Sequence, residues 1–155
     1  MQVIFSGKRL GASKKTLTVF VSKICRELKW HTLRSELNIV LISDREIRKL
    51  KKTFYHIDRA TDVIAFHYSH FVRKKEKGLA VIPFADIFVS VDTARRQALE
   101  GGHSLLQETA LLIMHGMLHI AGYRDHTARA RNKMFAEQRA LFRKLAPDLA
   151  PADFR

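Results

Sequence analysis

Apolar residues in the first quarter of the chain fall into short continuous runs and into helical spacings. Val3–Phe5 is a short β-prone run, and Leu37–Ser43 is apolar at nearly every position, as a central strand buried on both faces should be. Between these runs, apolar residues recur every three or four positions and predict a helix over about 14–29. Its buried face comprises Leu17, Phe20, Val21, Ile24 and Leu28.

The same alternation continues through the middle of the chain. Ser43 or Asp44 is a suitable first residue for a second helix, because short polar side chains cap helix N-termini. Asp62–Phe66 and Ala85–Val91 predict two more strands, joined through the charged and flexible stretch Arg73–Gly78. The inner face of the second helix is formed by Ile47, Leu50 and Phe54.

Three helices are predicted to follow the last strand. The first begins at Asp92 or Thr93, runs through about Leu99 and ends at the pair Gly101–Gly102. The second opens with a capping box made by Ser104 and Gln107. The third runs from about Thr127 to Leu145, before Pro147, and the tail from about 146 to Arg155 is expected to be loosely held.

This order of elements predicts a single α/β domain of the α+β type over residues 1–155. Its core would be a short mixed four-stranded sheet packed by about five helices. A length of 155 residues fits one hydrophobic core, and 46% hydrophobic residues is typical of a globular protein.

Charge narrows the class of partner. Lys and Arg number 28 against 15 Asp and Glu, which gives a formal net charge of +13. A small domain with this excess attracts polyanions, and no stretch has the aromatic-rich amphipathic face of a membrane-docking helix, so nucleic acid is the expected partner. Cys25 is the lone cysteine and no secretory signal or membrane-length apolar run is present, so a cytoplasmic protein is expected.

The strongest chemical signal is a pair of histidines in the apolar stretch 110–121. His115 and His119 are four residues apart, which on a helix stacks them on one face about 6 Å apart along the axis. Gly122 can adopt the left-handed conformation that ends a helix and turns the chain back. A third ligand can then arrive from beyond the turn. Three ligands with an open position are typical of a catalytic metal site.

Two residues compete for the third ligand position. In helices with the pattern H-x-x-x-H-x-x-G-x-x-H, the third ligand lies ten positions after the first, and Asp125 stands there. The imidazole of His126, one residue later, is the alternative ligand, and as a free side chain it would serve as an acid or base. Nitrogen and oxygen ligands favour zinc, one ion per chain, with nickel, manganese and iron as alternatives.

The residue after His115 argues against a peptidase. Zinc peptidases of the H-E-x-x-H kind use the glutamate at that position as the general base. Gly116 stands there in this chain, so a zincin-like metallopeptidase is the weakest of the candidate functions.

These residues resemble the YbeY family of bacterial endoribonucleases. Residues 115–126 are similar to its metal motif H-G-x-L-H-x-x-G-Y-D-H, with Arg124 as an insertion. Thr61–Phe66 resembles the family's T-D-V-L-S-F strand, and Asp86–Ser90 resembles its G-D-I-x-I-S strand. Glu108, seven residues before His115, matches a family glutamate that would lie behind the metal ligands.

The resemblance implies a single-strand-specific, metal-dependent endoribonuclease. Its substrate would be ribosomal RNA on the small ribosomal subunit, chiefly at the 3′ end, and it would help to remove defective ribosomes. It also implies a zinc ion held by His115, His119 and a ligand at Asp125 or His126. The alternative function is an RNA-binding ribosome assembly factor whose metal stabilises the fold.

One departure from the family concerns phosphate binding. Tyr55 occupies the position of a family arginine that contacts the RNA phosphate. Arg59 or His56 could instead bind the non-bridging oxygens, and His126 could shuttle a proton. Tyr55 itself could stack on an unpaired base.

Overall fold

The computed structural model describes residues 1–8, 13–30, 35–68 and 82–152. The predicted order of strands and helices is confirmed, and the stretch Arg73–Gly78 lies outside the described residues. The elements are β1 (Gln2–Gly7), α1 (Ser13–Glu27), β2 (Ser35–Ile42), α2 (Asp44–Tyr55), β3 (Val63–His67), β4 (Ile82–Ser90), α3 (Val91–Glu100), α4 (Leu105–Ile120), α5 (Ala128–Leu145) and the 3₁₀ turn η1 (Pro147–Leu149).

The described strands form one mixed sheet in the order β1-β2-β4-β3. β1, β2 and β4 run parallel, and β3 pairs antiparallel with β4. The apolar run at Leu37–Ser43 therefore sits in a central strand, as its composition predicts. β3 is an edge strand, and its free edge becomes part of the functional cleft described below.

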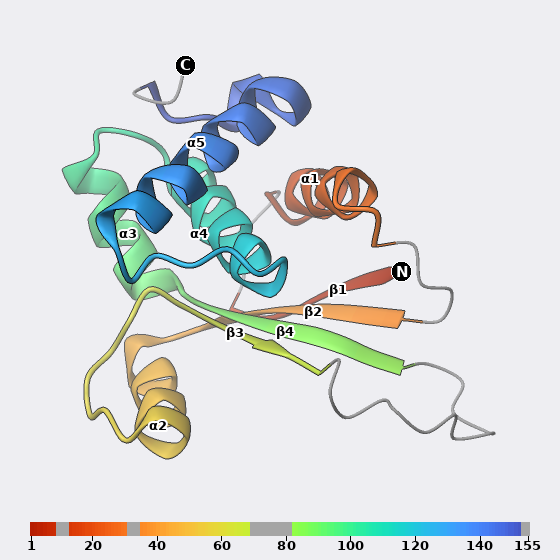
Figure 1. The fold of residues 1–155 in the computed structure, drawn as a ribbon. Helices are drawn as coiled ribbons and strands as arrows, with labels where there is room; N and C mark the ends of the chain where they lie inside the picture. The colour runs from red at the N-terminus through yellow and green to blue at the C-terminus, as the bar shows by residue number, and fades with distance from the viewer. Residues whose placement is uncertain (9–12, 31–34, 69–81, 153–155) are drawn as a thin grey trace.

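Helices cover both faces of this sheet (Figure 1). α1, α4 and α5 lie on one face, where Phe20 of α1 stacks on Phe142 of α5 with ring centroids 5.2 Å apart. α2 covers the other face over a small cluster formed by Ile42, Ile47 and Ile64. In the described ranges, no helix combines the length and the apolar character needed to cross a bilayer.

α4 packs closely on the sheet at Gly116. Met114, Met117 and Leu118 are fully buried, and each such side chain contributes about 1.5–3 kcal/mol to folding. Gly116 faces the sheet: a Cβ at this position would lie 3.0 Å from a methyl group of Ile87 and 3.3 Å from one of Val63. The glycine is therefore explained by helix–sheet packing, and position 116 does not face the histidine side of the helix.

α3 begins earlier than predicted. The sequence suggested a strand through Val91 and a helix cap at Asp92 or Thr93, but Ser90 is the cap and Val91 already belongs to the helix. The Asp92 carboxylate instead accepts a hydrogen bond from the backbone N–H of Asp44. Burial by itself raises the pKa of the Asp44 carboxyl. Hydrogen bonds from Ser90 and Thr93 and the charge of Arg96 outweigh this effect and lower the pKa to about 2.

Two further expectations are wrong. Phe54 is 59% exposed, because the last turn of α2 extends past the small apolar cluster, where the Phe54 ring meets that of Phe66. The tail is packed as far as Pro151: Ala150 is buried, and its carbonyl accepts a hydrogen bond from the Gln107 side chain at 3.1 Å. Residues 153–155 lie outside the described part of the chain.

Candidate metal centre

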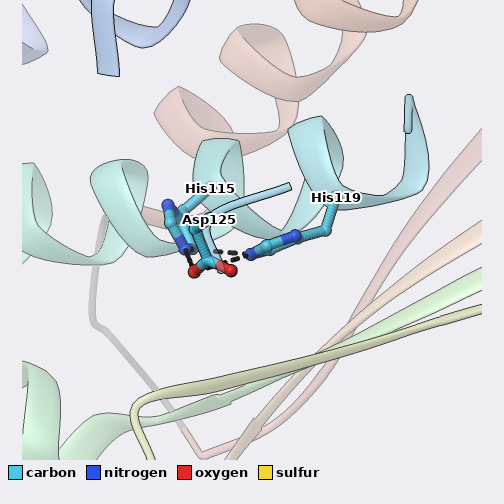
Figure 2. A group of neighbouring side chains, drawn as sticks. All are labelled: His115, His119 and Asp125. Atoms are coloured by element: carbon cyan, nitrogen blue, oxygen red, sulfur yellow. Dashed lines mark hydrogen bonds and ion pairs between the residues drawn. The ribbon is translucent and has the colours of Figure 1, made fainter. Parts of the chain in front are cut away.

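The two histidines lie on the last turns of α4 with their rings turned toward each other (Figure 2). The predicted capping box of Ser104 and Gln107 is present at the start of this helix. The ring centroids of His115 and His119 are 4.7 Å apart with the planes nearly perpendicular, and the two Nε2 atoms are 3.1 Å apart. Both side chains are partly open to solvent, at 21% and 29%.

The turn after α4 brings the chain back to these rings. Gly122 has a φ of +98°, the left-handed conformation that the sequence predicts for it. The backbone N–H of Tyr123 donates to the carbonyl of Leu118, which closes the turn. The Tyr123 carbonyl oxygen lies 3.2 Å from Nδ1 of His119 and can accept a hydrogen bond from an Nδ1–H there. This contact turns the Nε2 lone pair of His119 toward His115.

Asp125 is the residue that this turn delivers to the histidines. Its Oδ2 lies 3.6 Å from Nε2 of His119 and 3.9 Å from Nε2 of His115. The three ligand atoms all lie within 4.8 Å of one another. His126 stands outside this group: its side chain is 84% exposed, and its Nδ1 lies 3.9 Å from the other oxygen of Asp125. Of the two candidates for the third ligand, Asp125 is the one whose carboxylate lies near both histidines.

The chemistry of these donors fits a zinc ion. Two ligand atoms bound tetrahedrally at about 2.0–2.1 Å from zinc are about 3.3 Å apart, close to the separations found between the three atoms. Burial, and then the neighbouring His119, lower the pKa of His115. A lowered pKa keeps this imidazole neutral at neutral pH, which is the form that binds a metal. Two imidazoles and one carboxylate leave a fourth position open.

Gln138 of α5 supports the site and was missed by the sequence analysis. It is 1% exposed, and its Nε2 donates to the Leu111 carbonyl at 3.0 Å. Its Oε1 is buried without a well-formed hydrogen bond from the described residues, and the Gln138 side chain acts on His115 by raising its pKa. An acceptor here suits Nδ1–H of His115, with Nε2 left for a metal. The available signal was a polar residue on the apolar face that Met134 and Phe142 define.

Replacing Gln138 by leucine is expected to weaken zinc binding by about 10- to 100-fold, the usual cost of losing a hydrogen-bond partner of a metal-binding histidine. Competition with a chromophoric chelator measures this affinity. Gln138→Glu keeps an acceptor oxygen but loses the hydrogen bond to the Leu111 carbonyl, so it should retain more of the affinity than Gln138→Leu. Zinc binding by Gln138→Leu at the wild-type affinity would contradict this role for Gln138.

A cleft of about 700 Å³ adjoins the group of three candidate ligands, and His119 is the member of the group that lines it. One wall is the edge strand β3, the opposite wall is the end of α4 with the following turn, and the last turn of α2 contributes the rim. The described residues lining the cleft include six polar or aromatic side chains besides His119: Lys51, Tyr55, Thr61, His67, Arg124 and His126. Arg124 therefore faces the cleft that holds His119, and His67 is a further cleft residue that the sequence analysis did not single out.

Other predicted residues lie elsewhere. Arg59 and His56 are exposed on the connection after α2 and are not among the described residues that line the cleft. His56 ends α2 with a φ of +58°. Glu108 is buried two turns before His115, where its carboxylate contacts Nε2 of His103 at 2.5 Å. The site thus brings together His115, His119, Asp125, His126 and Tyr55, but leaves Arg59 and His56 at the outside.

Comparison with known proteins identifies the family of this chain. Residues 6–146 match the family model of endoribonuclease YbeY. The endoribonuclease YbeY of Elusimicrobium minutum is 37% identical over 117 residues, covering 76% of this chain and 79% of that protein. The endoribonuclease YbeY of Desulforamulus reducens is 34% identical over 125 residues, covering 81% of this chain and 82% of that protein.

A solved structure agrees with the fold. The solution structure of TM1509 from Thermotoga maritima superimposes with a TM-score of 0.60 at 24% sequence identity. The match covers 95% of this chain and 91% of that one. Given the extent of the family-model match and of the relatives' similarity, the chain belongs to the YbeY endoribonuclease family.

Proposed function

We propose that this protein is a single-strand-specific, zinc-dependent endoribonuclease. The observation that carries the proposal is the convergence of His115, His119 and Asp125 beside an open cleft that His119 lines, in a chain of the YbeY family. One zinc ion per chain would be held by these three side chains. A zinc ion bound there supplies Lewis-acid polarisation of the phosphate and lowers the pKa of a water molecule.

The residues of the chain have separate tasks in this reaction. Lys51 and Arg124 line the cleft and are placed to bind the non-bridging phosphate oxygens, whereas Arg59 and His56 are not among the described residues that line it. His126 is exposed at the same cleft, beside Asp125, and would carry a proton to or from the reacting oxygens. A peptidase reaction is disfavoured because Gly116 faces Ile87 and Val63 of the sheet, so no general base stands after His115.

The proposed substrate is ribosomal RNA, with the small ribosomal subunit as partner and the cytoplasm as location. Membership of the YbeY family supports an interaction with ribosomal RNA. The net charge of +13 supports binding to a polyanion. We assign this chain to 3′-end maturation of small-subunit ribosomal RNA and to the removal of defective ribosomes. A basic protein binding through phosphate contacts should lose affinity steeply as salt rises.

A cleavage assay on one RNA in two states tests the proposal. The substrate is a fragment of small-subunit ribosomal RNA with its 3′ extension, used alone and with the extension hybridised to a complementary strand. Zinc-loaded protein should cut the free extension and spare the hybridised one, and a chelator should stop the cutting. Binding without any cleavage would instead favour the assembly factor with a structural metal.

The product ends of the same assay identify the nucleophile. Attack by water leaves no cyclic phosphate, and a 2′-deoxy nucleotide at the cleavage site is then cut equally well. Attack by the 2′-hydroxyl leaves a 2′,3′-cyclic phosphate, and the deoxy substrate resists cleavage.

A further inference from the structure

Large apolar side chains are concentrated on the surface at the end of α2. Phe54 is 59% exposed, Tyr55 49% and Ile57 41%. Elsewhere in the described ranges, the exposed large apolar residues are single ones such as Val19 and Leu99. Single exposed apolar side chains are ordinary, whereas a contiguous group commonly marks a binding surface.

The aromatic rings of this group are held in a fixed arrangement by β3. The ring of Phe66 lies nearly parallel to that of Tyr55, with centroids 6.3 Å apart and an interplanar angle of 24°. It also meets Phe54 edge-on at 4.9 Å, and is itself packed against Phe88 of β4 at 6.0 Å. The exposed rings of Phe54 and Tyr55 are therefore supported from beneath, which lowers the entropic cost of using them for binding.

This group adjoins the metal centre through the cleft. Tyr55 and Ile57 line the same cleft as His119, and so does Lys51, one turn before Tyr55 on α2. α2 is rich in basic residues, and of these Arg48 and Lys52 both pair with Asp58. Exposed rings beside basic side chains are the combination by which proteins bind single-stranded nucleic acid, because bases stack on the rings and phosphates meet the cations.

We propose that Phe54, Tyr55 and Phe66 form an aromatic platform on which an unpaired base of the bound RNA stacks, beside the nucleotide at the metal centre. The platform rests on the proposed function, since it requires an RNA strand in the cleft. The platform gives Tyr55 a role different from that of the family arginine. Tyr55 would bind a base by stacking, whereas an arginine at this position would bind a phosphate. A base-paired strand cannot present a free face to the rings, so the platform also favours single-stranded substrates.

Equilibrium binding of a 5′-labelled, unstructured oligoribonucleotide tests the platform, with a chelator present so that the strand stays intact. Fluorescence anisotropy gives the Kd. Tyr55→Ala is expected to raise Kd by about 5- to 100-fold, the range for losing one base–aromatic stack. Tyr55→Trp keeps a flat ring and should retain tight binding. Leu99→Ala, which removes a side chain 79% exposed on α3, is the matched control and should leave Kd unchanged.

A series of strands, each lacking one base, shows whether the ring acts on a base. At one position along the strand, removal of the base should weaken binding to the wild type but cause no further loss in Tyr55→Ala. Equal losses in both proteins at every position would overturn the platform. Unchanged RNA affinity in Phe54→Ala and Tyr55→Ala would also overturn it and would assign the exposed rings to a protein partner.

The platform and the enzyme can fail separately. If the wild type binds and cuts single-stranded RNA while Tyr55→Ala binds equally well, the platform is wrong and the endoribonuclease stands. If the wild type binds no single-stranded RNA, the proposed function itself is wrong, and the platform is overturned with it.

Discussion

Replacing His119 by alanine is expected to give a folded protein that holds almost no zinc and does not cut RNA. His119 is the ligand closest to both other members of the site: its Nε2 lies 3.1 Å from that of His115 and 3.6 Å from Oδ2 of Asp125. Its removal leaves only two protein ligands, so zinc affinity should fall by more than about 100-fold, beyond the cost of losing a supporting partner. Elemental analysis of the purified variant measures the bound metal.

Binding and stability measurements give this result its meaning. The cleft and its basic residues remain in His119→Ala, so affinity for single-stranded RNA should stay close to that of the wild type. The melting temperature of the metal-free wild type is the reference for folding. A variant that keeps one zinc per chain would contradict the assignment of His119 as a ligand.

Replacing Asp125 by alanine is expected to be nearly as severe, while replacing His126 should leave zinc binding intact. The Asp125 carboxylate is directed at both histidines, whereas the His126 ring is 84% exposed and outside the group. Asp125→Ala should therefore lose bound zinc by elemental analysis. His126→Ala should retain one zinc per chain but cleave more slowly, by about 10²- to 10⁴-fold if it transfers a proton.

Bound zinc therefore separates the two roles, because both variants are expected to lose activity but only Asp125→Ala is expected to lose the metal. The reverse outcome, with zinc lost from His126→Ala and kept by Asp125→Ala, would show that the turn after Gly122 adjusts by one residue on metal binding. It would make His126 the third ligand.

The metal centre was largely predictable because its determinants are local. Ser104 and Gln107 fix the start of α4, helical spacing places His115 and His119 on one face, and Gly122 supplies the turn that only a left-handed residue makes easily. Spacing alone could not decide whether Asp125 or His126 is the third ligand. Resolving it requires knowing how far the inserted Arg124 carries the turn, and that depends on contacts such as the one between His119 and the Tyr123 carbonyl.

The errors arose where distant parts of the chain decide the structure. Val91 continues an apolar run and looks like strand, but Ser90 starts α3 because the Asp92 side chain is engaged by the backbone of α2. Phe54 has helical spacing but extends past the small cluster beneath α2. The hydrogen bond from Gln138 to the Leu111 carbonyl crosses from α5 to α4, and helical spacing within either element does not indicate that pairing.

Gly116 has a consequence for substrate access. The missing Cβ lets α4 approach Val63 and Ile87, and Val63 belongs to the strand that forms the far wall of the cleft. The distance between β3 and the candidate ligand atoms on α4 therefore depends on how closely α4 packs on the sheet at residue 116. A larger residue at position 116 would push α4 away from the sheet and widen the cleft between α4 and β3. The width of an RNA chain that fits between the metal centre and β3 therefore depends on residue 116, which does not line the cleft.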